Sequence, residues 1–169
     1  MNDDRRPLTA GPPAARARTA TLLEQVGPIV RRALVARYGT DVGAEAAAEA
    51  IAWGWEHGDV LADMANPGGY LYRVGQTAAR RGRRKISRTA FPIEPEWHDA
   101  PHLPGDVFDA LFRLSPDQRV AVMLVHGYRF SYHETAAVMG VTDDSVRNHV
   151  HRGMHRLRAD LEPHERRDL

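Results

Sequence analysis

Apolar side chains recur every three or four positions along most of this 169-residue chain. That spacing places them on one face of a helix, whereas a strand would show strict alternation. The first such stretch begins near Thr19 and stops at Gly39, and further stretches follow as far as Leu161. We find no strand pattern between them. The sequence therefore predicts an all-α fold.

The helical pattern is interrupted once, and the interruption predicts two domains. Residues 1–18 have no apolar periodicity and are expected to be a disordered tail. Residues 19–85 carry a first set of helices and residues 105–162 a second set. Between them, residues 86–104 contain Pro92, Pro95, Pro101 and Pro104, which is typical of a flexible linker. We expect two small helical domains joined by this linker.

Charge is distributed unevenly along the chain, although the net charge is only +1. Residues 38–66 hold six acidic residues and no Arg or Lys, whereas residues 73–88 hold seven basic residues and no acid. Segregation of this kind favours one surface for a polyanion and another for a different partner. Nearly all the basic residues are Arg, whose planar guanidinium suits phosphates and guanine edges.

The second domain contains the spacing of a helix-turn-helix. Ser131 with Glu134 predicts a capped helix start, and Gly140 predicts its end. Ala136 and Val146 lie four residues before and six residues after that glycine, where two crossing helices meet. A plain helical hairpin shows the same spacing, so the composition of the helix that follows is needed to distinguish it from a helix-turn-helix.

That following helix has one apolar face and one face rich in hydrogen-bond donors. Its expected buried residues are Val146, Val150, Met154, Leu157 and Leu161. Arg and Asn each make two hydrogen bonds to a base edge in the major groove, to guanine and adenine respectively. The polar face is therefore a candidate reader of duplex DNA, through Ser145, Arg147, Asn148, His149, His151 and Arg152.

A basic helix in the first domain suggests a different contact with nucleic acid. Aromatic rings beside a cationic surface suit a single strand, whose exposed bases can stack on them. A solvated helix face is the alternative, but the run has no carboxylate. The candidate residues are Tyr70, Tyr72, Arg73, Thr77, Arg80, Arg81 and Arg84.

Two blocks of the sequence resemble the extracytoplasmic-function (ECF) sigma factors of bacterial RNA polymerase, within the sigma-70 family. The block "NPGGYLYRVGQTAARRGRRK" resembles the region 2 helix of that family. The block "LSPDQRVAVMLVHGYRFSYHETAAVMGVTDDSVRNHVHRGMHRLR" resembles its region 4 over the full length. The resemblance extends from about residue 20 to residue 161.

The resemblance implies a role for each surface. Region 4 would read the −35 promoter element through the recognition helix, and region 2 would hold and melt the −10 element at the basic helix. The helix at residues 41–57 would contact core polymerase. Its implied polymerase-binding residues are Glu45, Glu49, Ile51 and Trp55. The two glutamates would face the polymerase clamp, while Ile51 and Trp55, with Ala44, Ala47 and Ala48, would form the apolar face of the helix. Core RNA polymerase, promoter DNA and an anti-sigma factor are the implied partners, in the bacterial cytoplasm at the nucleoid.

Two other classes of protein fit less well. A stand-alone helix-turn-helix regulator would usually dimerise on a palindrome, and no heptad seam is evident. An enzyme would need a catalytic or metal constellation. The chain has no Cys, and His149, His151 and His155 have no carboxylate at useful spacing. We therefore expect no enzyme activity, cofactor or bound metal.

Overall fold

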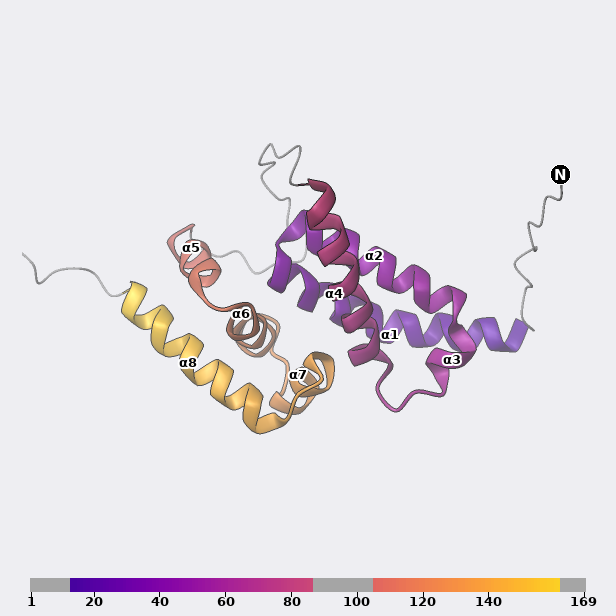
Figure 1. Cartoon of the computed structure of the whole chain (residues 1–169). Helices are drawn as coiled ribbons and strands as arrows, with labels where there is room; N and C mark the ends of the chain where they lie inside the picture. Colours follow the sequence, from indigo (N-terminus) through magenta and orange to yellow (C-terminus); the bar gives the residue numbers. More distant parts are fainter. Residues whose placement is uncertain (1–12, 87–104, 162–169) are drawn as a thin grey trace, which may run out of the picture.

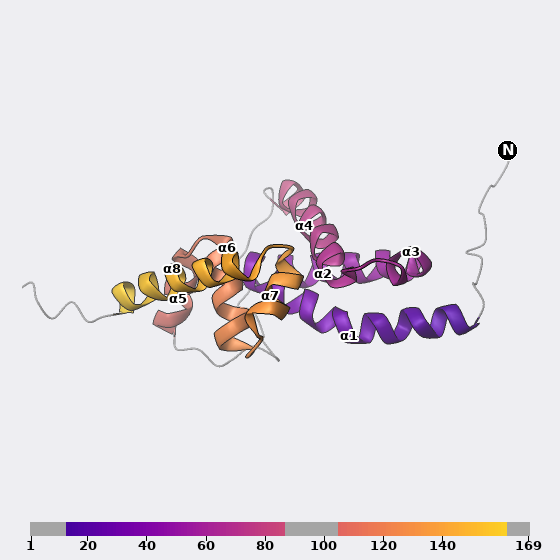
Figure 2. The ribbon, with the colours of Figure 1, turned by 90° about the horizontal axis from the view of Figure 1, so that it is seen from below.

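The computed structural model describes residues 13–86 and 105–161, with the backbone alone for residues 83–86. Every regular element in those two ranges is a helix, which confirms the predicted fold class. The expected linker lies outside the described residues except for Ile86, and so do residues 1–12 of the expected tail. Figures 1 and 2 show two groups of helices lying side by side.

The first group contains four helices, of which three pack around α1. They are α1 (Pro13–Tyr38), α2 (Thr40–Glu56), α3 (Gly58–Ala62) and α4 (Pro67–Ile86). Helix α1 starts six residues earlier than the sequence predicted, so residues 13–18 are not a disordered tail. Pro13 opens the helix, where its missing N–H costs nothing, and Ala15 and Thr19 are buried. Thr19 packs against Gly58 of α3.

Helix α2 turns a stripe of small residues towards the core rather than the face that the sequence predicted. Its buried residues are Gly43, Ala46, Ala47, Ala50 and Gly54. Only Ala47 of the expected apolar face is fully buried, and Trp55 is 51% exposed. Close packing is the reason, because a Cβ atom on Gly43 would lie 2.5 Å from Cα of Val35 in α1. A large side chain cannot occupy that contact.

The second group begins with α5 (Gly105–Arg113) and α6 (Pro116–Val122), which runs directly into the π-helix η1 (Met123–Gly127). Helices α7 (Tyr132–Met139) and α8 (Asp143–Leu161) complete it. Ser115 and Ser131 form the two predicted capping boxes with Gln118 and Glu134, respectively. The wider turn of η1 was not predicted, and Arg129 follows it with φ of 60°.

One apolar core runs through both groups of helices. Val30, Leu34 and Leu71 of the first group belong to the same buried cluster as Val120 and Leu124 of the second. Helices α1 and α4 supply the first group's side of this contact, and α6 and α7 supply the second group's side. The sequence predicted two domains on a linker but not their packing against each other.

Candidate nucleic-acid interface

The turn between α7 and α8 has the geometry of a helix-turn-helix. Gly140 adopts φ of 66°, in the left-handed region that glycine enters without strain, and it ends α7. The N–H of Val141 then donates to the carbonyl of Ala136 at 3.1 Å. Ala136 and Val146 are 3% and 0% exposed and belong to one buried cluster. The predicted packing of the two helices is confirmed.

Helix α8 is amphipathic, and its donor-rich face is open to solvent. Val146, Val150 and Leu157 are buried as expected, and Met154 and Leu161 are partly buried. Buried Gly153 was missed: a Cβ atom there would lie 2.7 Å from Cγ2 of Val122 in α6. The side chains of Arg147, Asn148, His151 and Arg152 are exposed, whereas those of Ser145 and His149 are half-buried.

Two of these polar side chains are held by neighbours within the motif. A guanidinium N–H of Arg147 donates to Asp144 at 2.7 Å, and its Cζ lies 5.6 Å from the centre of the Tyr132 ring. Ser145 has a structural task, because its N–H donates to Oγ1 of Thr142 at 3.2 Å and its hydroxyl lies 2.9 Å from the same atom. Thr142 thus caps α8, and Ser145 is the least available of the predicted readers.

The first turn of α7 also carries charge close to this surface. Ser131 donates through its N–H and its hydroxyl to Glu134, at 2.8 and 2.7 Å. These hydrogen bonds lower the pKa of Glu134. His133 Nδ1 lies 3.5 Å from Asp143 Oδ1 at the start of α8. The edge of the motif beside the recognition helix therefore holds acidic as well as basic groups.

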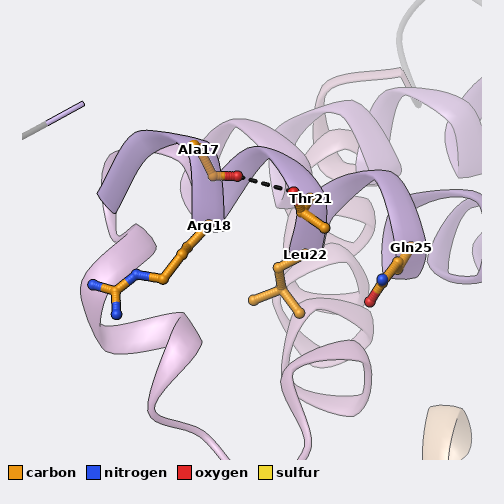
Figure 3. A pocket seen from close by; sticks show the side chains of 5 residues that line it. All are labelled: Ala17, Arg18, Thr21, Leu22 and Gln25. Atoms are coloured by element: carbon orange, nitrogen blue, oxygen red, sulfur yellow. Dashed lines mark hydrogen bonds between the residues drawn. The ribbon is translucent and has the colours of Figure 1, made fainter. Parts of the chain in front are cut away.

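A hollow lies beside the exposed face of α8. It is lined by His126, Tyr132, Arg147, Asn148, Val150, His151, Met154 and Arg158. Three of the predicted readers therefore border one concave surface, together with the apolar side chains of Val150 and Met154. A second hollow, on α1, is lined by Ala17, Arg18, Thr21, Leu22 and Gln25 (Figure 3). It lies in the first group of helices, away from α8, and has a single charged side chain.

Helix α4 presents most of the predicted basic face to solvent. Tyr70, Arg73, Thr77, Arg80 and Arg81 are exposed, and the side chain of Arg84 lies outside the described residues. The Thr77 hydroxyl donates to the carbonyl of Arg73 at 3.1 Å. Arg81 lies 3.9 Å from Glu49 of α2, and both side chains are more than half exposed. Solvent and salt screen a pair of this kind, so the arginine stays available.

Tyr72 does not belong to the exposed surface, contrary to the sequence prediction. It is 1% exposed and is the largest of the fully buried side chains. Burial raises the pKa of its hydroxyl, and the nearby charge of Arg37 offsets part of that rise. The cause is helix geometry: two positions turn a side chain by about 200°, so Tyr70 and Tyr72 face opposite ways.

The sequence reading missed a second aromatic ring beside Tyr70. The ring centre of Trp53 in α2 lies 5.0 Å from that of Tyr70, and Trp53 stacks on His57 with centres 4.3 Å apart. The four-residue spacing of Trp53 and His57 was the available signal, because it places both on one side of α2. The aromatic surface next to the basic helix therefore comes from two helices.

The predicted polymerase-facing residues of α2 divide into two kinds. Glu45 and Glu49 are exposed, as is Trp55. Ile51 is half-buried, and its Cδ1 atom would lie 3.5 Å from a Cβ atom on Gly27 of α1.

Among the described residues, no three His, Asp or Glu side chains are grouped so as to hold a metal ion. None of the described helices is long and apolar enough to cross a membrane.

The second group of helices matches a known family. The family model for "Sigma-70, region 4" matches residues 106–157, from α5 to α8. These residues form a sigma-70 region 4 domain. Its match bears out the resemblance drawn from the second sequence block, and it places α8 as the last helix of that domain.

Two proteins that are similar to part of this chain carry sigma-factor names. The RNA polymerase sigma-E factor of Streptomyces antibioticus is 41% identical over 56 residues, which cover 33% of this chain and 31% of that protein. The ECF RNA polymerase sigma factor SigE of Mycolicibacterium smegmatis is 39% identical over 111 residues, which cover 57% of this chain and 43% of that protein. The match thus spans less than half the length of these relatives and extends beyond the region 4 domain in the second.

A solved structure has the same fold. The sigma factor RpoE of Bartonella quintana, in complex with the anti-sigma factor NepR, superposes with a TM-score of 0.59 at 22% sequence identity. The superposition covers 86% of this chain and 97% of that chain. The all-α arrangement of both groups of helices is therefore the fold of a sigma factor.

Proposed function

We propose that this chain is a bacterial sigma factor of the ECF type, which binds core RNA polymerase and directs it to promoters. The region 4 domain at residues 106–157 carries this proposal, because it presents an exposed donor-rich face on α8. The relatives named as RNA polymerase sigma factors support it. We assign residues 13–86 to region 2 and residues 105–161 to region 4. The role is non-catalytic, and it places the protein in the cytoplasm.

Helix α8 reads the −35 element as duplex DNA. Arg147 and Asn148 are its principal base readers, since both are exposed near the start of the helix, where a recognition helix enters the major groove. His151 and Arg152 lie one turn further along and extend the contact. Ser145 and His149 support the helix start more than they read bases, because both are half-buried.

Helix α4 holds the −10 element as a melted strand. Arg73, Arg80 and Arg81 supply cationic contacts along one exposed face, with Thr77 between them and Arg84 further along the helix. Tyr70 and Trp53 supply the stacking surface, in place of the pair of tyrosines that the sequence suggested. Tyr72 is buried and packs α4 against the core.

Helix α2 contacts core polymerase through its exposed side. Glu45 and Glu49 provide the charge, and Trp55, 51% exposed, provides an apolar anchor. Half-buried Ile51 positions α2 against α1. An anti-sigma factor is the third partner that we propose, since the RpoE structure with the same fold was solved in complex with one.

In vitro transcription with purified core polymerase tests the proposal. We expect transcripts that require the chain, on a library of promoter fragments whose start sites are then mapped. Asn148→Ala should reduce these transcripts and change the preferred −35 sequence, because the adenine-reading amide is lost. His155→Ala is a matched control, because His155 is exposed on the same helix beyond the predicted readers.

A pull-down with core polymerase separates this function from the alternative. Reversing Glu45 and Glu49 together to Lys should weaken holoenzyme assembly, whereas Glu24→Lys, at an exposed position of α1, should leave it unchanged. A chain that binds duplex DNA but neither binds core polymerase nor supports transcription would instead be a stand-alone regulator.

A further inference from the structure

The two groups of helices are joined by a buried arginine at a helix end. Arg119, in the first turns of α6, is 7% exposed. Its Nε donates to the carbonyl of Ala36 at 2.6 Å, and its Nη2 donates to the carbonyl of Arg37 at 2.5 Å. Both carbonyls belong to the last turn of α1, where backbone acceptors have no partner within the helix. Arg119 therefore caps α1 from the other domain, with the charge that a helix C-terminus favours.

A second contact joins the same two domains, and here the first group of helices supplies the donor to a helix C-terminus in the second group. Asn66 precedes α4, and its Oδ1 accepts from the N–H of Gly69 at 2.8 Å, as an N-cap does. Its Nδ2 donates to the carbonyl of Ala137, in the last turn of α7, at 2.7 Å. Each contact thus pairs the C-terminal end of one helix with the N-terminal end of another, once in each direction.

An ion pair reinforces the first contact. Arg37 of α1 hydrogen-bonds to Asp117 of α6. Burial alone would lower the pKa of Arg37, but the Asp117 carboxylate, together with Tyr72 and Tyr38, more than offsets that effect and raises the pKa. The Cζ of Arg32 also lies 5.2 Å from the centre of the Tyr128 ring, between the same two domains. We call Arg119 with its two carbonyl acceptors, together with the Arg37–Asp117 pair, the latch.

The latched arrangement brings the two proposed DNA surfaces together. The guanidinium of exposed Arg73 on α4 lies at the helix-turn-helix turn, 3.0 Å from the position that a Cβ atom on Gly140 would take. Elements centred near −35 and −10 are about 25 base pairs apart, or about 85 Å at 3.4 Å per pair. Domains that touch at α4 and α7 cannot reach both elements at once.

The contacts that hold this arrangement are suited to opening. The carbonyls of Ala36 and Arg37, the guanidinium of Arg119 and the Arg37–Asp117 pair are all polar and regain hydrogen bonds with water when the domains separate. Because water replaces each lost bond, the net cost of opening is far smaller than the strength of the bonds themselves. Separation also exposes apolar surface from the shared core, and so the closed state is favoured when no partner is bound.

We propose that the free chain is held in a closed, self-inhibited state by the latch, and that it must open before it can read a promoter. This inference rests on the proposed sigma-factor function. A partner that binds the open state, such as core polymerase with its promoter, shifts the population by its greater affinity for that state. Weakening the latch should raise the population of the open state before any partner binds.

Energy transfer between two dyes on the full chain tests the latch directly. The chain has no Cys, so Gln25→Cys on α1 and His133→Cys on α7, both exposed, give two unique labelling sites. Arg119→Ala should lower the transfer efficiency, because α1 loses its cap from α6. Arg113→Ala is the matched control: it breaks an ion pair with Asp160 inside region 4, at 3.3 Å, and should leave the transfer efficiency unchanged.

A charge swap covers the case in which Arg119→Ala fails to fold. Asp117→Arg should lower the transfer efficiency by placing two cations together, and Arg37→Asp in the same chain should restore it. Circular dichroism confirms that each variant keeps its helix content. Unchanged transfer in Asp117→Arg with full helicity would overturn the latch.

Promoter opening then tests inhibition separately from closure. With core polymerase, we expect Arg119→Ala and Asp117→Arg to need several-fold less chain than wild type for half-maximal permanganate reactivity at the −10 element. Lower transfer without this change would show that closure does not inhibit, and that part of the proposal would be wrong. If even the wild type opens no promoter, the proposed function fails while the transfer result still decides the latch.

Discussion

Arg147 of the recognition helix is oriented before any DNA is bound. Its guanidinium donates to Asp144 one turn earlier, at 2.7 Å, and lies over the Tyr132 ring. Both partners belong to the motif itself, so the side chain loses less conformational freedom when it meets a base. Arg158 is exposed three residues before the end of α8, where a contact with phosphate is more natural than a contact with a base edge.

Replacing each of these two arginines should therefore affect DNA binding in a different way. Arg147→Ala should cost about 1–3 kcal/mol of discrimination at one −35 position, because a bidentate contact to guanine is lost. Arg158→Ala should weaken binding to every sequence equally and reduce the salt slope by about one unit. Holoenzyme binding to a panel of single-base −35 variants, at several salt concentrations, measures both. Identical profiles for the two variants would contradict this division.

Individual side chains were predicted unevenly, for physical reasons. The exposure of Arg147 and Asn148 followed from helical spacing alone. The same spacing places Tyr72 opposite Tyr70, so its burial was predictable and was overlooked. Arg119 is different, because a basic residue near a helix start is usually solvated, and the two carbonyls of α1 that it caps lie more than 80 residues away in the sequence. Nothing local to Arg119 indicated that it would be buried.

At the scale of elements, helix starts were more predictable than helix faces. Ser115 and Ser131 marked their helices correctly, because a capping box is a local hydrogen-bond pattern. The inward face of α2 was misassigned, because periodicity in an Ala-rich helix does not separate small residues packed against a neighbour from small residues in solvent. The neighbour decides, and α1 approaches α2 closely at Gly43.

Two glycines give a matched test of that close approach. Gly43→Ala should destabilise the protein by about 1–3 kcal/mol, because the new Cβ atom meets the backbone of Val35 and cannot rotate away. Gly82→Ala on α4 should stabilise it by up to about 1 kcal/mol, since no described atom beyond the adjoining stretch of α4 lies within 4 Å of the new Cβ and alanine favours helix. Urea unfolding monitored by circular dichroism measures both, and changes of the same sign would refute the packing argument.

At the scale of the whole molecule, the shared core implies coupled unfolding. Leu34 and Leu124 belong to one buried cluster although they lie in different domains. The sequence predicted both domains, because each has its own helical periodicity. It could not predict their docking, since the docked surfaces are formed by residues that also fit the interior of a separate small domain.

Calorimetry should reveal the coupling. We expect the wild-type chain to unfold in one transition and Arg119→Ala to unfold in two, because domains that no longer share a cap and a core melt separately. Arg113→Ala should keep the single transition at a slightly lower temperature, since its ion pair lies within one domain and is largely exposed. Two transitions in the wild type would show that the domains are already independent.

The π-helix η1 has a consequence for how this protein tolerates insertions and deletions. A π turn holds one more residue than an α turn, so η1 is equivalent to an α-helix with a single inserted residue. Deleting one residue between Met123 and Gly127 would restore regular α-helix and turn the exit of the chain by about 100°. Helix α7 would then leave α6 in a different direction, and Gly153 of α8 would lose its close packing against Val122 of α6. A one-residue deletion there is therefore a larger change than most substitutions in the recognition helix itself.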